Sequence, residues 1–362
     1  MENHFEAVSK YLQEGKKIIL ARIIRQTGSI PRAAGTQCIV LEDGSIKGTI
    51  GGGLLEHRVM ERAKECLKKE KSSMMHFELT GDEVAKTDML CGGVADVYLE
   101  TVFPENPVAG EIFERISSFI KKGRKGVLLT LVSDGIRPED EKSRLLIEED
   151  GSTTGEIGMV SGEDKKRLAK ILEIKTPKLT EIKKGKESVF VEPLRPYDIL
   201  YLFGAGHVST FVALLANMVG FRVVVIDDRR EFANKERFKE ADEIIVLPFS
   251  EVFKKINISS SSYIAIITRG HIQDLNVLRE ALKRSDGYIG MIGSKRKREK
   301  IYQVLMEEGV SDKRLKQVHS PIGLDIEAET PEEIAVSIVA ELIRVRASSN
   351  ISLRGPESGR KK

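Results

Sequence analysis

The sequence predicts an α/β protein in two parts: an N-terminal domain of mixed α+β structure and a C-terminal domain built on a doubly wound parallel sheet. The chain has 362 residues, a length typical of two domains. Beyond residue 198, short apolar segments alternate with helical patterns, which is typical of a parallel sheet with helices on both faces. The first half mixes both kinds of pattern without that alternation, which favours α+β structure.

The composition excludes several classes of protein. The chain has 58 lysines and arginines and 55 aspartates and glutamates, a net charge of +3, which argues against a protein that coats nucleic acid. An apolar fraction of 41% is enough to build buried cores, so we do not expect a disordered chain. No apolar run is long enough for a membrane helix, and no secretory signal pattern is visible. We therefore expect a cytoplasmic protein with no membrane span and no nucleic-acid partner.

The elements of the N-terminal domain are predicted from the spacing of its apolar residues. Helical spacing indicates helices over 1–14 and 54–67, and β-rich composition indicates strands at 18–24 and 37–41. Asp43-Gly44 is a turn signal after the second strand. The other elements expected here are strands near 74–79, 94–102 and 126–132 and a helix at 109–121.

A lysine-rich stretch at 175–186, which contains Pro177 and Gly185, is predicted to connect the two domains. The alternative is an exposed hairpin inside the first domain. With the first interpretation, the N-terminal domain covers 1–186 and the C-terminal domain 187–346. Residues 347–362 are rich in Ser, Arg, Lys and Gly and are expected to form a flexible basic tail.

The C-terminal domain shows a regular succession of strands and helices. The expected strands are 199–203, 223–226, 244–247, 263–267 and 288–292. The expected helices are 206–219, 274–283, 295–307 and 332–345.

A glycine motif stands where the first of these strands ends and a helix begins. A Gly-x-Gly pair allows a tight turn and lets backbone N–H groups approach a pyrophosphate at the helix N-terminus. An acidic residue about 20 positions later, at the end of the second strand, is placed to bind a ribose hydroxyl. This pattern predicts a Rossmann-like, nucleotide-binding fold, although the glycines can also serve the turn alone. The candidate binding residues are Gly204, Ala205, Gly206, His207, Asp227, Asp228 and Arg229.

Two more polar clusters follow the fourth and fifth strands. Ligands of such sheets bind outside the carboxyl ends of the strands, so these clusters are expected at the same edge. The basic run 295–298 opens a helix, where cations oppose the helix dipole unless an anion is bound. A solvated basic face is the alternative. His207 and His271 are candidates for proton transfer, or else rim and capping residues. The binding residues predicted here are His271, Gly293, Ser294 and Lys295.

The first half contributes two glycine-rich segments, 28–35 and 48–56. Three consecutive glycines before a helix leave backbone donors unobstructed for an anionic or planar ligand, and an arginine nearby can add a bidentate phosphate contact. Turns and close helix–sheet packing explain the same glycines equally well. The candidate binding residues are Arg32, Gly51, Gly52 and Gly53.

One of the three cysteines is a candidate functional group. Cys91 precedes Gly92 and Gly93, whose free N–H groups could stabilise a thiolate and let a ligand approach it. A buried structural thiol is the alternative. Cys38 lies within a predicted strand and Cys66 within a predicted helix, so both are expected to be packing residues. No His or Cys spacing indicates a zinc or iron–sulfur site, so no metal site is predicted.

Together, these segments resemble the XdhC/CoxI family, the accessory factors of xanthine dehydrogenase and related molybdenum hydroxylases. The resemblance extends over about residues 10–346. The family has two adjacent cysteines before Gly-Gly, whereas Leu90 stands before Cys91 here. The segments that carry the resemblance are 28–35, Asp43-Gly44, 48–56, Cys91-Gly92-Gly93, 203–208, Asp227-Asp228-Arg229, 292–297, 320–326 and 330–338.

The resemblance implies a chaperone for molybdenum cofactor (molybdopterin) rather than a xanthine dehydrogenase itself. Such a protein binds the cofactor, supports its sulfuration by a cysteine desulfurase and helps insert it into the hydroxylase. We expect the cofactor between the two domains, with Cys91 near its metal end in a catalytic role and 204–207 near its phosphate end. A homodimer is expected because symmetric dimers are the commonest assemblies.

Two other functions fit the residues. The first is an NAD(P)-dependent oxidoreductase that uses the C-terminal domain with NAD(P) or another nucleotide, and Asp227 then favours NAD. The second is an assembly factor that contacts only the partner hydroxylase and binds no cofactor.

Overall fold

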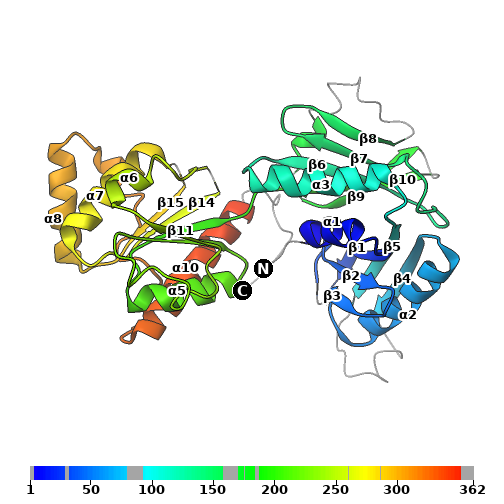
Figure 1. Ribbon diagram of the computed structural model, residues 1–362, viewed down its shortest axis with the longest axis horizontal. Coiled ribbons are helices and arrows are strands. Elements are labelled where there is room, and N and C mark those ends of the chain that lie inside the picture. Colours follow the sequence, from blue (N-terminus) through cyan, green and yellow to red (C-terminus); the bar gives the residue numbers. More distant parts are fainter. Residues whose placement is uncertain are drawn as a thin grey trace. The chain divides into compact units, whose positions relative to one another are not determined.

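The computed structural model describes residues 4–28, 32–79, 93–157, 170–174, 176–183, 187–259, 261–285 and 287–351. The chain divides into an N-terminal unit, Glu2–Pro196, and a C-terminal unit that begins at Tyr197 (Figure 1). The N-terminal unit has two sheets and the C-terminal unit has one, and each unit has its own hydrophobic cores.

The first sheet of the N-terminal unit is antiparallel, with the order β3-β2-β1-β5-β4. Helix α2 packs on one face and forms a core with the inward-facing residues of the strands, because its apolar residues recur at helical spacing. The elements predicted for this region are confirmed, and the structure adds the short strand β3 after the turn at Asp43-Gly44. Their bounds are β1 (Ile18–Gly28), β2 (Gln37–Leu41), β3 (Ile46–Gly48), α2 (Gly53–Lys69), β4 (Ser73–Leu79) and β5 (Gly93–Val102).

A second antiparallel sheet has the order β8-β7-β6-β10-β9, and only its strand β6 was predicted. Helix α3 packs against β7 and β8, and α1 lies beside α3 with Phe5 stacked on Phe113. The bounds are α1 (His4–Gln13), α3 (Pro107–Lys121), β6 (Gly126–Val132), β7 (Ser143–Glu148), β8 (Thr153–Ile157), β9 (Lys178–Lys183) and β10 (Glu187–Leu194).

The described part of the lysine-rich stretch contributes strand β9 to this second sheet. β9 and β10 pair antiparallel, so the alternative interpretation, a hairpin inside the first domain, describes the stretch correctly. β10 is also hydrogen-bonded to β6, which holds 187–194 in the N-terminal unit. The division of the chain therefore falls after Pro196 rather than after residue 186.

Charged residues from both sheets of the N-terminal unit meet in a buried network. Glu100 on β5 accepts from Arg22 and, at 2.5 Å, from Nε of Arg144 on β7. Nη1 of Arg22 on β1 lies 3.4 Å from Oε2 of Glu192 on β10. All four residues are buried, and burial lowers the pKa of Arg144 to about 10. A buried charge is tolerated only when it is paired, so these contacts fix how the two sheets pack.

The C-terminal unit contains a five-stranded, fully parallel sheet with the order β13-β12-β11-β14-β15 (Figure 1). The predicted doubly wound sheet is confirmed. Four of the strands, β11, β12, β14 and β15, are largely buried on both faces, which explains their nearly continuous apolar residues, whereas the edge strand β13 is only partly buried. Their bounds are β11 (Ile199–Phe203), β12 (Arg222–Asp227), β13 (Glu243–Val246), β14 (Ser262–Ile266) and β15 (Tyr288–Met291).

Helices cover both faces of this sheet (Figure 1). α5 and α10 form one core with residues of alternate strand positions, and α6, α7 and α8 form a second core on the other face. α10 continues to Ile351, so 347–351 are helical rather than a flexible tail, and 352–362 lie outside the described residues. The bounds are α5 (His207–Met218), α6 (Phe249–Val252), α7 (His271–Arg284), α8 (Lys295–Glu307), α9 (Asp312–Leu315) and α10 (Pro331–Ile351).

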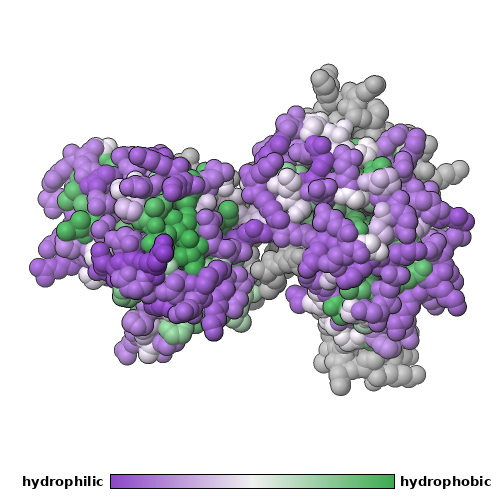
Figure 2. All heavy atoms as spheres, in the orientation of Figure 1, coloured by the Kyte–Doolittle hydropathy of each residue, from purple (hydrophilic) through white to green (hydrophobic). Residues whose placement is uncertain are grey.

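The surface shown in Figure 2 is mainly hydrophilic, with apolar areas of limited extent. Within the part of the chain that the structure describes, no helix is both long and apolar enough to span a membrane.

Candidate functional site

The candidate site lies at the carboxyl edge of the parallel sheet. From the central strand β11 the chain moves to β12 and β13 on one side and then to β14 and β15 on the other. The loops after β11 and β14 therefore leave the sheet in opposite directions, and the crevice between them is where such folds bind ligands. Gly204 directly follows β11 with a φ of +104°, and a Cβ there would collide with the carbonyl oxygen of Ile267.

The first two glycines of the motif have different structural roles. Gly204 is required by the close approach of the β14 backbone. Gly206, which caps α5, has a φ of −76°, and a Cβ there would meet no atom within 4 Å. Only Gly206 therefore leaves room for something other than this chain to approach.

Asp227 holds the glycine turn from the end of β12. The N–H of Ala205 donates to its Oδ2 at 2.8 Å, and the N–H and Nε of Arg229 donate to its Oδ1 at 3.0 and 2.9 Å. Burial raises the pKa of Asp227, but the hydrogen bonds from the Arg229 side chain and from the two amides outweigh burial, so the pKa lies below its usual value. The carboxylate is therefore ionised and engaged through both oxygens.

Ala205 is also held through its carbonyl oxygen. Nη1 of Arg237 donates to it at 2.9 Å. With its N–H bound by Asp227, both backbone groups of Ala205 serve the turn itself. The N–H groups at the start of α5, from His207 onward, have no partner within the helix and are the ones a ligand could use.

Asp228 and Arg269 link the loops that follow β12 and β14. Nη2 of Arg269 lies 3.3 Å from Oδ2 of Asp228. The guanidinium of Arg229 stacks over the ring of Phe232 at 3.8 Å and lies 3.7 Å from Oδ1 of Asp228. The predicted residues Asp227, Asp228 and Arg229 are thus brought together with the glycine turn.

The basic run 295–298 is divided by the structure. Lys297 forms an ion pair with the buried Asp274 on α7, and Asp274 accepts from Thr268 Oγ1 at 2.7 Å. Arg298 donates from Nη1 to the carbonyl oxygen of Ser320 at 2.9 Å. Lys297 and Arg298 are therefore structural.

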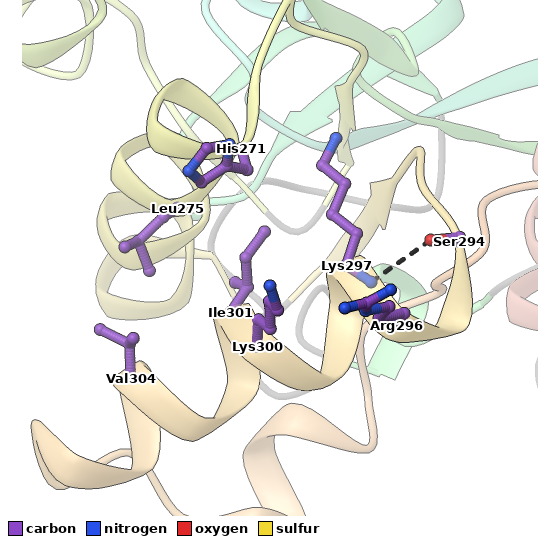
Figure 3. Close-up of a pocket in the computed structure, with 8 residues that line it drawn as sticks. All are labelled: His271, Leu275, Ser294, Arg296, Lys297, Lys300, Ile301 and Val304. Carbon is purple, nitrogen blue, oxygen red and sulfur yellow. Dashed lines mark hydrogen bonds between the residues drawn. The ribbon is translucent and has the colours of Figure 1, made fainter.

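Two other cations of α8, Arg296 and Lys300, border a cavity of about 470 Å³ between α7 and α8 (Figure 3). His271 and Ser294, which were predicted as binding residues, line it, and Ser294 also caps α8 by accepting from the N–H of Lys297 at 3.3 Å. Its apolar floor could not be predicted from the sequence, because such positions are also typical of ordinary core. The remaining lining residues are Leu275, Lys297, Ile301 and Val304.

A second polar cluster, which sequence reasoning did not single out as a site, lies beside β15. Oε2 of Glu341 accepts from the Tyr288 hydroxyl and the Gly323 N–H, both at 2.8 Å, and Oε1 lies 2.9 Å from Nδ1 of His319. Burial raises the pKa of Glu341, but the hydrogen bonds from His319, Gly323 and Tyr288 outweigh it and leave the pKa below its usual value. This cluster anchors part of the segment 320–326 to α10.

In the N-terminal unit, the glycine triplet leads directly into α2. Gly52 is the N-cap with a φ of +73°, and Oε2 of Glu56 accepts from Thr49 Oγ1 at 2.6 Å and from the Ile50 N–H at 3.2 Å. Arg32 is exposed and Gly93 is buried at the start of β5. The structure thus shows how the triplet starts a helix. Cys91 and Gly92 lie outside the described residues.

Cys38 and Cys66 are packing residues, as predicted. Both are buried in the core between the first sheet and α2. Burial raises the pKa of the Cys38 thiol to about 12 and that of Cys66 to about 11. Among the described residues, no group of three or more His, Cys, Asp and Glu side chains is placed to hold a metal ion.

Comparisons with known proteins extend along most of the chain. It is 24% identical over 345 residues to the uncharacterized protein YqeB of Escherichia coli, covering 95% of this chain but only 46% of YqeB, so it spans about half of that relative. It is 24% identical to a probable xanthine dehydrogenase subunit of Bacillus subtilis, over 96% of this chain and 98% of that protein. It is 21% identical to the molybdenum cofactor insertion chaperone PaoD of E. coli, and the match covers 92% of this chain and 85% of PaoD.

A solved structure has the same fold. The crystal structure of a Bacillus halodurans protein described as a xanthine dehydrogenase matches with a TM-score of 0.77 and 26% identity, over 95% of this chain and 96% of that one. The family model for the XdhC Rossmann domain matches residues 200–342, and the model for the XdhC and CoxI family matches residues 11–78. The N-terminal unit thus matches one model of this family and the C-terminal unit matches the other, and the chain belongs to the XdhC/CoxI family.

Proposed function

We propose that this chain is an accessory factor that binds molybdenum cofactor as its cargo and delivers it to a xanthine dehydrogenase-type molybdenum hydroxylase. The main support is the carboxyl edge of the parallel sheet, which offers groups that can bind an anion. The chain is also similar over most of its length to a molybdenum cofactor insertion chaperone. The similarity to a probable xanthine dehydrogenase component supports a hydroxylase of that type as the client.

The residues at this edge fit one end of such a cargo. A phosphate group needs cations or free N–H groups, and a planar pterin needs an apolar surface. The open approach at Gly206, the first N–H groups of α5 and the basic rim of the α7–α8 cavity supply these features. When bound, the cargo carries the metal and the dithiolene that the client enzyme requires for its chemistry.

The finer part of the proposal concerns sulfuration. We propose that a cysteine desulfurase acts on the bound cofactor and that Cys91 serves its metal end, as a ligand or as a sulfur carrier. Gly92, Gly93 and Arg32, with the triplet 51–53, are proposed to contribute from the N-terminal unit. We also propose a homodimer, which light scattering after size exclusion will test.

The test is cofactor retention. The full chain is produced in cells that make molybdenum cofactor, purified by size exclusion and assayed for oxidised pterin fluorescence per protein. Gly206→Asp should lower retention because it places a carboxylate beside the first N–H groups of α5, where an anionic group of the cargo would approach. Cys91→Ala should lower the sulfurated fraction. Gly110→Asp, at a helical glycine whose Cβ would meet nothing within 4 Å, is the matched control. Unchanged retention in Gly206→Asp would refute cofactor binding at this edge. An unchanged sulfurated fraction in Cys91→Ala, measured as the sulfur that cyanide releases, would refute the proposed role of Cys91.

The NAD(P)-dependent oxidoreductase is the weaker candidate. In such enzymes a free carboxylate at the end of the second strand binds the ribose. Here both oxygens of Asp227 are engaged by Ala205 and Arg229. Titration with NADH separates the two functions, because micromolar binding with hydride transfer to an acceptor would favour the enzyme.

A further inference from the structure

The cavity between α7 and α8 is separate from the glycine turn. It lies beside the helices that follow β14 and β15, whereas the turn follows β11. Two ion pairs join α7 to α8. Lys297 pairs with Asp274 at the edge of the sheet. Further along the helices, Nε and Nη2 of Arg279 donate to Oε2 and Oε1 of Glu308 at 2.6 and 2.7 Å. These contacts connect the two helices that border the cavity.

The rim of the cavity carries uncompensated positive charge. Arg296 and Lys300 line it, Lys295 precedes them on the same helix, and all three are exposed. Within the described part of the chain, these side chains make no hydrogen bond or ion pair. Among the described residues that line the cavity, none is acidic. The rim is therefore suited to a group with at least one full negative charge.

The floor is apolar. Leu275 comes from α7, and Ile301 and Val304 extend from α8 toward α7 (Figure 3). A free inorganic anion would leave this surface in contact with water, whereas a ring system laid on it would remove apolar area from water. A volume of about 470 Å³ lies within the usual range of small-molecule sites.

We propose that this cavity binds a phosphate monoester of a planar heterocycle, with Arg296 and Lys300 on the phosphate and the floor of Leu275, Ile301 and Val304 against the ring. His271, at the start of α7, borders the same space and can donate to the ester. Free nucleotides and the phosphorylated pterin of the proposed cargo share this chemistry. The experiments with free nucleotides do not depend on the proposed function. Only the experiments with the bound pterin rest on it.

The first measurement is calorimetric titration of the full chain with GMP and AMP, with guanosine and inorganic phosphate as partial ligands. A mononucleotide should saturate the protein, and both partial ligands should bind at least about tenfold more weakly because each lacks one half of the interaction. Equal binding of GMP and inorganic phosphate would overturn the role of the floor. Failure of GMP, AMP and the pterin to bind would overturn the site.

Variants locate the binding. Removing both rim cations in Arg296→Ala/Lys300→Ala should weaken nucleotide binding about 10- to 100-fold, since each charge-assisted contact is lost. Lys254→Ala/Lys255→Ala removes the same charge from two other exposed positions of this unit and should change nothing. Val304→Asp, at a side chain only 37% exposed, should abolish binding, whereas Val336→Asp on α10, at 50% exposure, should not. Equal effects of the cavity variants and their controls would refute the location.

Measurements of bound pterin decide whether the cavity holds the proposed cargo or a free nucleotide. If the cargo occupies the cavity, GMP should release bound pterin from the wild-type chain, and Arg296→Ala/Lys300→Ala should be isolated without it. If wild-type protein retains no pterin but binds GMP through these cations, the proposed function fails while the cavity remains a nucleotide site. Retention of pterin in the double variant, with no effect of GMP, would assign the cargo elsewhere.

Discussion

The N–H of Ala205 donates a 2.8 Å hydrogen bond to Oδ2 of Asp227, so the carboxylate that this fold commonly offers to a ribose is used to hold the glycine turn. Arg229 occupies the other oxygen. The turn is therefore fixed before any ligand arrives, and ligand recognition is left to the start of α5 and to the cavity beside α8.

Asp227→Asn should destabilise the protein by about 2–4 kcal/mol, because it removes the charged partner of Arg229 and of two amides at a buried position. Asp228→Asn, at the neighbouring and more exposed carboxylate, is the control and should cost much less. Urea unfolding at pH 7 measures both changes. Equal losses in the two variants would contradict a structural role for Asp227.

The two glycines of the turn should separate stability from binding. Gly204→Ala should destabilise by about 2–5 kcal/mol, through its positive φ and the collision with Ile267. Gly206→Ala should change the free energy of unfolding by less than about 1 kcal/mol, because its φ is ordinary and its surroundings are open. Thermal and urea unfolding test this, and a Gly206 variant as unstable as the Gly204 variant would show that both glycines serve the fold.

Arg22→Met should destabilise the N-terminal unit by about 3–5 kcal/mol, because Glu100 and Glu192 would lose a buried cation. Lys142→Ala breaks an exposed ion pair with Glu156 and should cost no more than about 1 kcal/mol. Urea unfolding of the two variants checks the difference. A cost for Arg22→Met as small as for Lys142→Ala would show that the network does not fix the packing of the sheets.

Cys38 and Cys66 should be inert in the folded protein. With pKa values raised to about 12 and about 11, their thiolate fraction at pH 8 is at most about one in a thousand, and both are buried. A Cys91→Ser variant should react with a chromogenic disulfide only after unfolding, when both thiols are released. Rapid labelling of the native variant would mean that one of these cysteines is accessible.

The pair of His76 and Asp96 should make stability depend on pH. The hydrogen bond to Asp96, at 2.5 Å, raises the pKa of His76 above 6.5. The stabilisation is therefore complete below the unfolded pKa and is lost as the pH rises through the folded pKa. The urea midpoints of wild type and His76→Gln should differ more at about pH 5.5 than at about pH 8.5. A difference that does not change with pH would contradict this assignment.

The sequence by itself determined the parallel sheet of the C-terminal unit and most of its helix positions. Buried parallel strands need nearly continuous apolar runs, and the intervening helices need their own spacing, so both leave clear patterns. It also determined that Cys38 and Cys66 pack in a core, since each lies within a strand or helix. Most strands of the second antiparallel sheet leave no clear pattern. β9 begins and ends with lysine inside a lysine-rich stretch that resembles a linker, and β8 has a single apolar residue, Ile157.

Only the tertiary structure decided which polar residues are available to a ligand. The sequence presents Asp227, Lys297 and Arg296 alike as polar residues at one edge. The fold engages Asp227 with the glycine turn and Lys297 with Asp274, and leaves Arg296 on the rim of a cavity. Side-chain partners come from distant segments whose approach depends on the packing of whole elements, so local pattern carries no record of them.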